Sequence, residues 1–167
     1  LPQYFTFCYS KIQDVSIQPE IRENILQFFQ GCLISSTNIE FFEENVDQLL
    51  EIIFNIACCK CENDPELFQM NHSDKLLEII ANDPDFVDLV YSVLMDKTIA
   101  AQKEGNAVQF KAGLCCLAVI VEDAHDAFSC HNEEVDSIII AAFETDNPLI
   151  YSDVCHLVHL LSQSSFD

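Results

Sequence analysis

The chain has 167 residues, with 28 aspartates and glutamates against only 7 lysines and arginines, which gives a formal net charge of −21. This charge has the wrong sign for binding nucleic acid or an anionic membrane surface, whereas it attracts basic proteins and peptides. Only 3 glycines and 5 prolines occur and 50% of the residues are hydrophobic, so we expect a helical chain with a substantial core. A soluble acidic surface without a specific partner is the alternative interpretation of the charge.

Eight amphipathic helices are predicted, arranged as four consecutive pairs. The first helices of the pairs span 2–13, 43–60, 85–103 and 132–144, and their partners span 19–35, 65–81, 107–123 and 148–163. Pro19, Pro65 and Pro148 stand at first helical positions, where the missing N–H of proline is tolerated, and Asn106 is a candidate cap before Ala107. These starts are 46, 42 and 41 residues apart, which agrees with the ~40–47 residue period of HEAT and armadillo repeats.

The predicted fold is therefore an all-α, HEAT-type helical-repeat solenoid of about four helix pairs. Its units span 1–35, 43–81, 85–123 and 132–163, and together they form a single repeat segment over 1–167. The polar stretch 70–74 interrupts the helix predicted over 65–81, so a separate short helix over 75–81 is an alternative there. Because the chain begins at Leu1 and stacked units bury their faces against neighbours, we expect a segment of a longer solenoid.

The spacing of apolar residues predicts which face of each helix is buried. In the helix over 19–35, the predicted buried stripe is Ile21, Ile25, Phe28, Phe29 and Cys32. In the helix over 43–60, the inward residues are Val46, Leu49, Leu50, Ile53 and Ala57, and the outward ones are Glu44, Asp47, Gln48, Glu51 and Asn55. In the last helix, the inward residues are Ile150, Val154, Leu157, Val158 and Leu161, and the polar side holds Asp153, His156 and Gln163.

Nine cysteines are present, most of them inside apolar runs such as LCCLAVIV. Their odd number and adjacent pairs do not resemble a secreted disulfide framework, so we expect them to be reduced and mostly buried in a reducing compartment. The longest apolar tract is interrupted by Glu51 and Asn55. Since a membrane-spanning helix needs about 18 uninterrupted apolar residues, we expect no membrane insertion.

No pattern of catalytic or metal-binding residues stands out. Cys58, Cys59 and Cys61 lack a second pair of ligands with zinc-site spacing, and they are interpreted as core or helix-end thiols. His156 and His159 could share a helix face, but no third ligand is identifiable, and they are interpreted as surface or interface histidines. Without a nucleophile elbow or a glycine-rich phosphate loop, the chain is predicted not to be an enzyme and to need no cofactor.

The motifs KAGL at 111–114, VEDA at 121–124 and DNPLI at 146–150 lie in the segment 108–163. With them, this segment resembles the HEAT repeats of importin-beta-type karyopherins, and most closely the importin four and importin five branch. A helix opens with KAGL at 111–114 and ends in VEDA at 121–124, and an apolar helix over 135–143 follows. The next helix then opens with DNPLI at 146–150. The order of these motifs is similar to the family's pattern, although Tyr151 stands where the family usually has arginine.

The resemblance implies a nuclear transport receptor that shuttles between cytoplasm and nucleus. Its partners would be basic protein cargo, such as nuclear localisation segments, histones or ribosomal proteins, and the GTPase Ran would act on the full-length protein. In such solenoids the second helix of each pair lines the concave face, which selects the candidate partner-binding residues Glu20, Glu23, Glu78, Glu122, Asp123 and Asp153. The alternative is a HEAT-repeat scaffold for complex assembly without a transport role.

Overall fold

The computed structural model describes residues 2–14, 16–35, 39–63 and 72–164, and across them the chain is all-α, with nine helices and no strand. The helices are α1 (Pro2–Ile12), α2 (Pro19–Ile34), α3 (Ile39–Asn63), α4 (His72–Ala81), α5 (Val87–Glu104), α6 (Ala107–Val119), α7 (His125–Cys130), α8 (Asn132–Phe143) and α9 (Pro148–Ser164). The helix start predicted at Pro65 lies outside the described residues.

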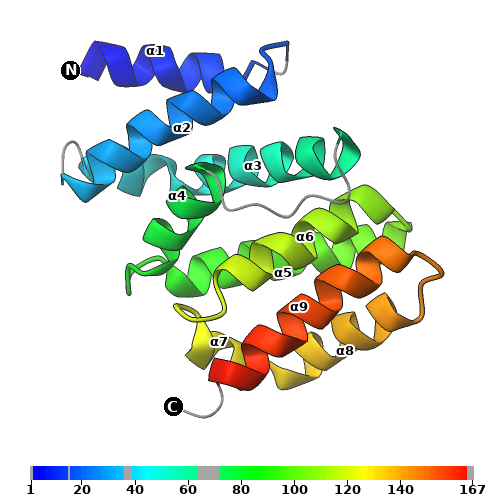
Figure 1. Cartoon of the computed structure of the whole chain (residues 1–167). Coiled ribbons are helices and arrows are strands. Elements are labelled where there is room, and N and C mark those ends of the chain that lie inside the picture. Colours follow the sequence, from blue (N-terminus) through cyan, green and yellow to red (C-terminus); the bar gives the residue numbers. More distant parts are fainter. Residues whose placement is uncertain (1, 15, 36–38, 64–71, 165–167) are drawn as a thin grey trace.

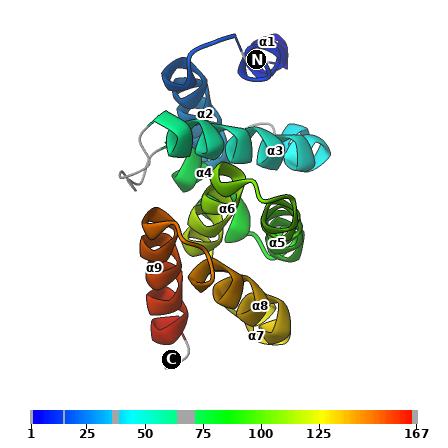
Figure 2. The ribbon, with the colours of Figure 1, turned by 90° about the vertical axis from the view of Figure 1, so that its right-hand side faces the viewer.

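The helices follow one another in a stack, from α1 and α2 at one end to α8 and α9 at the other (Figures 1 and 2). The second helices of successive pairs contact one another, since α2 packs on α4, α4 on α6 and α6 on α9. In addition, the long helix α3 packs directly on α6. Buried side chains from every described helix, α1 to α9, join one hydrophobic core.

Helix ends follow from local sequence signals. α5 stops at Gly105, whose φ of 68° is a left-handed conformation that glycine adopts without steric penalty. α6 begins one residue after Asn106, whose side chain accepts a 3.1 Å hydrogen bond from the Gln109 N–H. In the same way, the Asn147 side chain accepts the Leu149 N–H ahead of α9. The predicted stop and restart between α5 and α6 is therefore confirmed.

α6 is the central helix, and it is apolar on nearly all sides because α3, α4, α5 and α9 surround it. It approaches α5 most closely where Gly113 faces the buried Thr98. A Cβ added at Gly113 would overlap the Thr98 hydroxyl and lie 2.9 Å from the Thr98 Cβ. Glycine at 113 is therefore a packing requirement of the contact between α5 and α6.

The predicted faces are confirmed for α3 and corrected for α2. All five predicted inward residues of α3 are buried and all five predicted outward residues are exposed. In α2, however, Ile21 and Phe28 are 50% and 38% exposed, while Arg22 and Leu26 are buried in their place. The contacts of α2 with α3 and α4 select this neighbouring stripe, which is equally apolar along Leu26, Phe29 and Leu33.

In α9, the predicted inward residues Ile150, Val154 and Leu157 are buried, but Val158 is 37% exposed. Asp153, predicted on the polar side, is buried at 8% exposure, because α9 packs against α6 and Asp153 pairs there with Lys111. The short helix α7 was also not predicted: α6 ends at Val119, and a turn precedes α7.

The cysteines are less buried than predicted. Among the nine free cysteines, only Cys32 and Cys116 are buried, five are partly exposed, and Cys130 and Cys155 are exposed. Cys130 ends the short helix α7, and Cys155 lies on the outer side of α9, positions that the apolar context of the sequence did not reveal. Within the part of the chain that the structure describes, none of the helices has the length and apolar character of a membrane span.

Candidate functional site: an acidic groove beside α5

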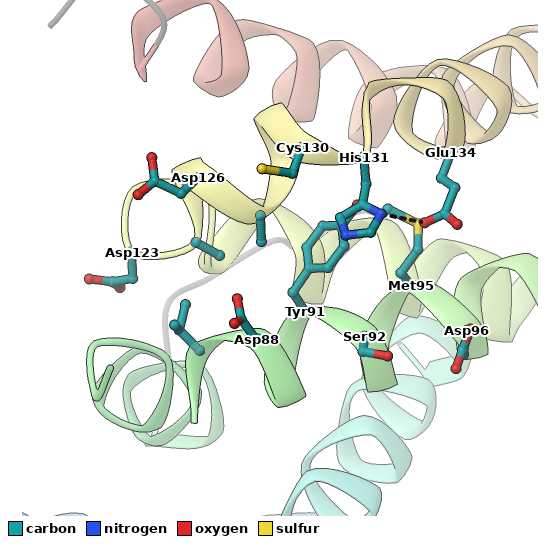
Figure 3. Close-up of a pocket in the computed structure, with 13 residues that line it drawn as sticks. Asp88, Tyr91, Ser92, Met95, Asp96, Asp123, Asp126, Cys130, His131 and Glu134 are labelled. Carbon is teal, nitrogen blue, oxygen red and sulfur yellow. Dashed lines mark ion pairs between the residues drawn. The ribbon is translucent and has the colours of Figure 1, made fainter. Parts of the chain in front are cut away.

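A groove of about 720 Å³ lies between α5, α7 and the start of α8 (Figure 3). Its walls carry five carboxylates that come from separate parts of the chain. Asp88 and Asp96 lie on α5, Asp123 on the turn before α7, Asp126 on α7 and Glu134 on α8. The apolar side chains of Val87, Met95, Ala124 and Ala127 complete the lining. The groove therefore combines strongly negative and apolar surface.

An aromatic side chain, Tyr91, lies in the wall of this groove. Its ring stacks on His131 at a centroid distance of 5.4 Å and meets Phe128 edge-on at 5.0 Å. Tyr91 is only 3% exposed, and its hydroxyl has no hydrogen-bond partner among the described residues. Burial, and to a lesser degree the Glu134 carboxylate, raises the pKa of Tyr91 to about 12. An unpaired buried hydroxyl is unfavourable unless a partner supplies the missing bond.

The carboxylates of the groove have little opposite charge beside them in the part of the chain that the structure describes. Among the described residues, no lysine or arginine forms an ion pair with any of the five. Two histidines lie near, with His131 Nδ1 3.7 Å from Glu134 and His125 Nδ1 3.7 Å from Asp126. Two imidazoles cannot offset five carboxylates, so the groove keeps most of its negative charge.

Asp123 lies between this groove and a smaller cleft of about 260 Å³, which Glu78 and Lys75 also line. Burial raises the pKa of Asp123, and the carboxylates of Glu78 and Glu122 raise it further. Three carboxylates from α4 and the turn after α6 are thus held close enough to repel one another. A cation bound here would relieve that repulsion.

The six candidate partner-binding residues predicted from the sequence do not gather at one place in the structure. Glu78, Glu122 and Asp123 form the group just described, whereas Glu20 is exposed on α2. Glu23 accepts a 2.9 Å hydrogen bond from the His72 N–H at the start of α4 and pairs with Lys60 at 3.2 Å. Asp153 is buried in its 2.5 Å ion pair with Lys111. Glu23 and Asp153 thus make contacts within the fold.

The groove residues that sequence reasoning missed come from α5, α7 and the start of α8. Asp88, Tyr91, Ser92, Met95 and Asp96 all line the groove, and they follow one another at helical spacing. This stripe mixes acids with an aromatic ring and a methionine on one helix face, a signal that could have been found. The candidate residues predicted from the sequence lie on second helices, whereas α5 and α8 are the first helices of their pairs.

No group of histidines, cysteines and carboxylates with metal-binding geometry occurs within the described ranges. The arrangement is suited to holding a positively charged chain, because dispersed carboxylates accept charge-assisted hydrogen bonds from several cationic side chains at once. Comparison with known proteins gives no relative: no family model matches the chain, and neither does any curated protein or solved structure.

Proposed function

We propose that this chain is a binding module that holds a basic segment of a partner protein in the groove beside α5. The observation that carries the proposal is the gathering of five carboxylates, none paired with lysine or arginine in the described chain, along one groove. Lysine and arginine side chains supply both the charge and the hydrogen-bond donors that such a surface lacks.

The groove favours a peptide over a small molecule as the occupant. Its carboxylates are spread over α5, α7 and α8 and do not converge on one point (Figure 3). An extended segment with several cationic side chains satisfies dispersed acids in a way that one small cation does not. The net charge of −21 also accelerates the encounter with a basic partner.

We further propose that the helix pairs belong to a HEAT-type array. The recurring starts at Pro19, Ala107 and Pro148 and the succession of contacts α2–α4, α4–α6 and α6–α9 support this. The buried Lys111–Asp153 ion pair joins the second helices of two neighbouring pairs, as a stacking contact between repeated units would. Ile140, Phe143 and Val158 are exposed at the α8–α9 end, a face that suits a neighbouring unit.

With the karyopherin-like motifs of 111–150, the natural cargo is a basic protein destined for the nucleus, and the parent is a transport receptor regulated by Ran. A pull-down of the full-length protein with the GTP and GDP forms of Ran separates this role from a scaffold role. Binding to the GTP form alone supports transport. Binding of basic peptides with no nucleotide-dependent binding of Ran supports a scaffold.

The groove is tested by titrating a fluorescent arginine- and lysine-rich peptide with the purified chain and following anisotropy. The first variant carries Asp88→Asn, Asp96→Asn and Asp126→Asn. Its control carries Glu43→Gln, Glu44→Gln and Asp47→Asn on the exposed face of α3, so both remove three charges. At ~0.5 kcal/mol for each exposed contact, the groove variant should bind about tenfold more weakly.

The control variant should stay close to the unmodified chain, because its three residues line none of the described pockets. Equal losses in the two variants would mean that the whole acidic surface attracts the peptide without a groove. If the unmodified chain does not bind the peptide at low salt, the proposed function is wrong.

A further inference from the structure

Four cysteines gather where α3 packs on α6, away from the groove. Cys58 and Cys61 lie in the last turns of α3, and Cys115 and Cys116 lie in the middle of α6. The thiols of Cys61 and Cys115 are in hydrogen-bonding contact with each other. The proposed function uses none of these side chains.

Charged groups adjoin this thiol pair. The Asp153 carboxylate on α9 accepts a 2.5 Å hydrogen bond from Lys111 Nζ, and the Cys115 thiol lies beside that carboxylate. A polar network thus runs from Cys61 through Cys115 and Asp153 to Lys111, and it links α3, α6 and α9. Asp74 also lies near Cys61, and His156 lies near Asp153.

The network makes the two thiols unequal. The hydrogen bond with Cys115 lowers the pKa of Cys61, and the positive charge of Lys111 lowers it further against the opposing effect of burial. The same hydrogen bond and burial raise the pKa of Cys115. Cys61 is therefore the better nucleophile, since the thiolate is the reactive form. By contrast, burial raises the pKa of nearby Cys58 to about 12.

Both members of the pair are partly exposed, whereas Cys116 is buried. We propose that Cys61 and Cys115 are a modification site at which a hydroperoxide, such as hydrogen peroxide, forms a reversible disulfide between α3 and α6. The two thiols are already in contact on helices that pack against each other, as a disulfide between α3 and α6 requires.

The reaction balances with the peroxide as the oxidant. The Cys61 thiolate attacks one peroxide oxygen, the O–O bond breaks, and the hydroxide that leaves takes up the proton lost from Cys61 to form water. The Cys115 sulfur then attacks the sulfenic acid on Cys61. The S–S bond forms as the S–O bond breaks, and the hydroxide that leaves takes the Cys115 proton to give a second water. Two thiols are oxidised and one peroxide is reduced.

The test treats the whole purified chain with one equivalent of hydrogen peroxide, blocks the remaining thiols with an alkylating reagent, and maps the peptides without reduction. The expected result is a mass loss of two hydrogen atoms and one cross-linked peptide that contains Cys61 and Cys115. Dithiothreitol should reverse both changes. A cross-link between any other cysteines, or Cys61 over-oxidised beside a free Cys115, would overturn the proposal.

Variants give a second readout. Cys61→Ser and Cys115→Ser should each abolish the cross-link almost completely, while the double variant Cys130→Ser, Cys155→Ser should form it as the unmodified chain does, since those thiols are exposed and lie apart from the pair. Circular dichroism establishes that each variant folds. The peptide map of the unmodified chain tests the proposed disulfide by itself. The proposal therefore stays testable even if one of the variants does not fold.

Discussion

At the scale of single residues, the structure holds charged groups in buried or partly buried positions, which is unfavourable unless an opposite charge lies beside them. Lys111 and Asp153 compensate each other at 9% and 8% exposure. Asp123 has no such partner within the described chain and lies beside Glu78 and Glu122. The first arrangement holds helices together, and the second leaves a negative site that an external cation would stabilise.

Replacing Lys111 with methionine should strongly destabilise the fold. The Asp153 carboxylate would remain buried without its ammonium partner, and breaking a buried pair in this way costs about 3–5 kcal/mol of unfolding free energy. The matched control is Lys97→Met, whose partner Glu51 is exposed and whose loss should cost ~0–1 kcal/mol. Urea unfolding of both variants measures the difference, and equal losses would contradict the buried-pair account.

Asp123→Asn should stabilise the fold and weaken peptide binding at the same time. Folding raises the pKa of Asp123, so it favours the protonated carboxyl. That contribution is complete below the ordinary aspartate pKa of 3.8 and is lost as the pH rises through the folded-state value. The variant should therefore melt at a higher temperature than the unmodified chain at pH 7, with the gain fading in acid.

The control for this prediction is Asp136→Asn, which removes the same charge from an exposed position on α8. It should change neither the melting temperature nor the peptide affinity by a comparable amount. If both variants show the same change in melting temperature and in peptide affinity, repulsion among the carboxylates around Asp123 does not explain either change.

At the scale of helices, most of the fold could be predicted from the sequence because helix starts and stops depend on near neighbours. Asn106, Gly105 and Pro148 act within one turn of the chain, and the helix boundaries beside them agree with the structure. Which stripe of α2 is buried depends on α3 and α4, which lie far along the chain, so Ile21 was misplaced. For the same reason the groove, assembled from three helices, was not found.

Replacing either of two helical glycines with alanine should change the stability of the fold, but in opposite directions. Gly113→Ala inserts a methyl group against the Thr98 side chain at the contact of α5 with α6, and such overpacking typically costs about 1–3 kcal/mol. Gly31→Ala in α2 meets nothing within 4 Å and should gain about 0.5–1 kcal/mol of helix stability. Thermal unfolding of the pair measures both signs, and a stabilising Gly113→Ala would show that the two helices do not pack so closely.

At the scale of the whole molecule, the net charge of −21 has two effects. Repulsion between the like charges destabilises the folded state, and the same negative charge attracts basic partners. Salt should therefore act on stability and on binding in opposite directions. Raising the ionic strength from about 0.01 M to about 0.15 M shortens the Debye length from ~30 Å to ~8 Å. The melting temperature should rise, and the affinity for a basic peptide should fall steeply. A peptide affinity that is independent of salt would contradict an electrostatic groove.

The most direct measurement is a chemical-shift map of the labelled chain during titration with the arginine- and lysine-rich peptide. Our account predicts that the largest shifts occur at Asp88, Tyr91 and Asp96 on α5 and around Asp126 and His131, with small changes at Glu43, Glu44 and Asp47 on α3. Comparable shifts over every acidic face, or shifts concentrated on α1 to α3, would contradict a basic segment bound in the groove beside α5.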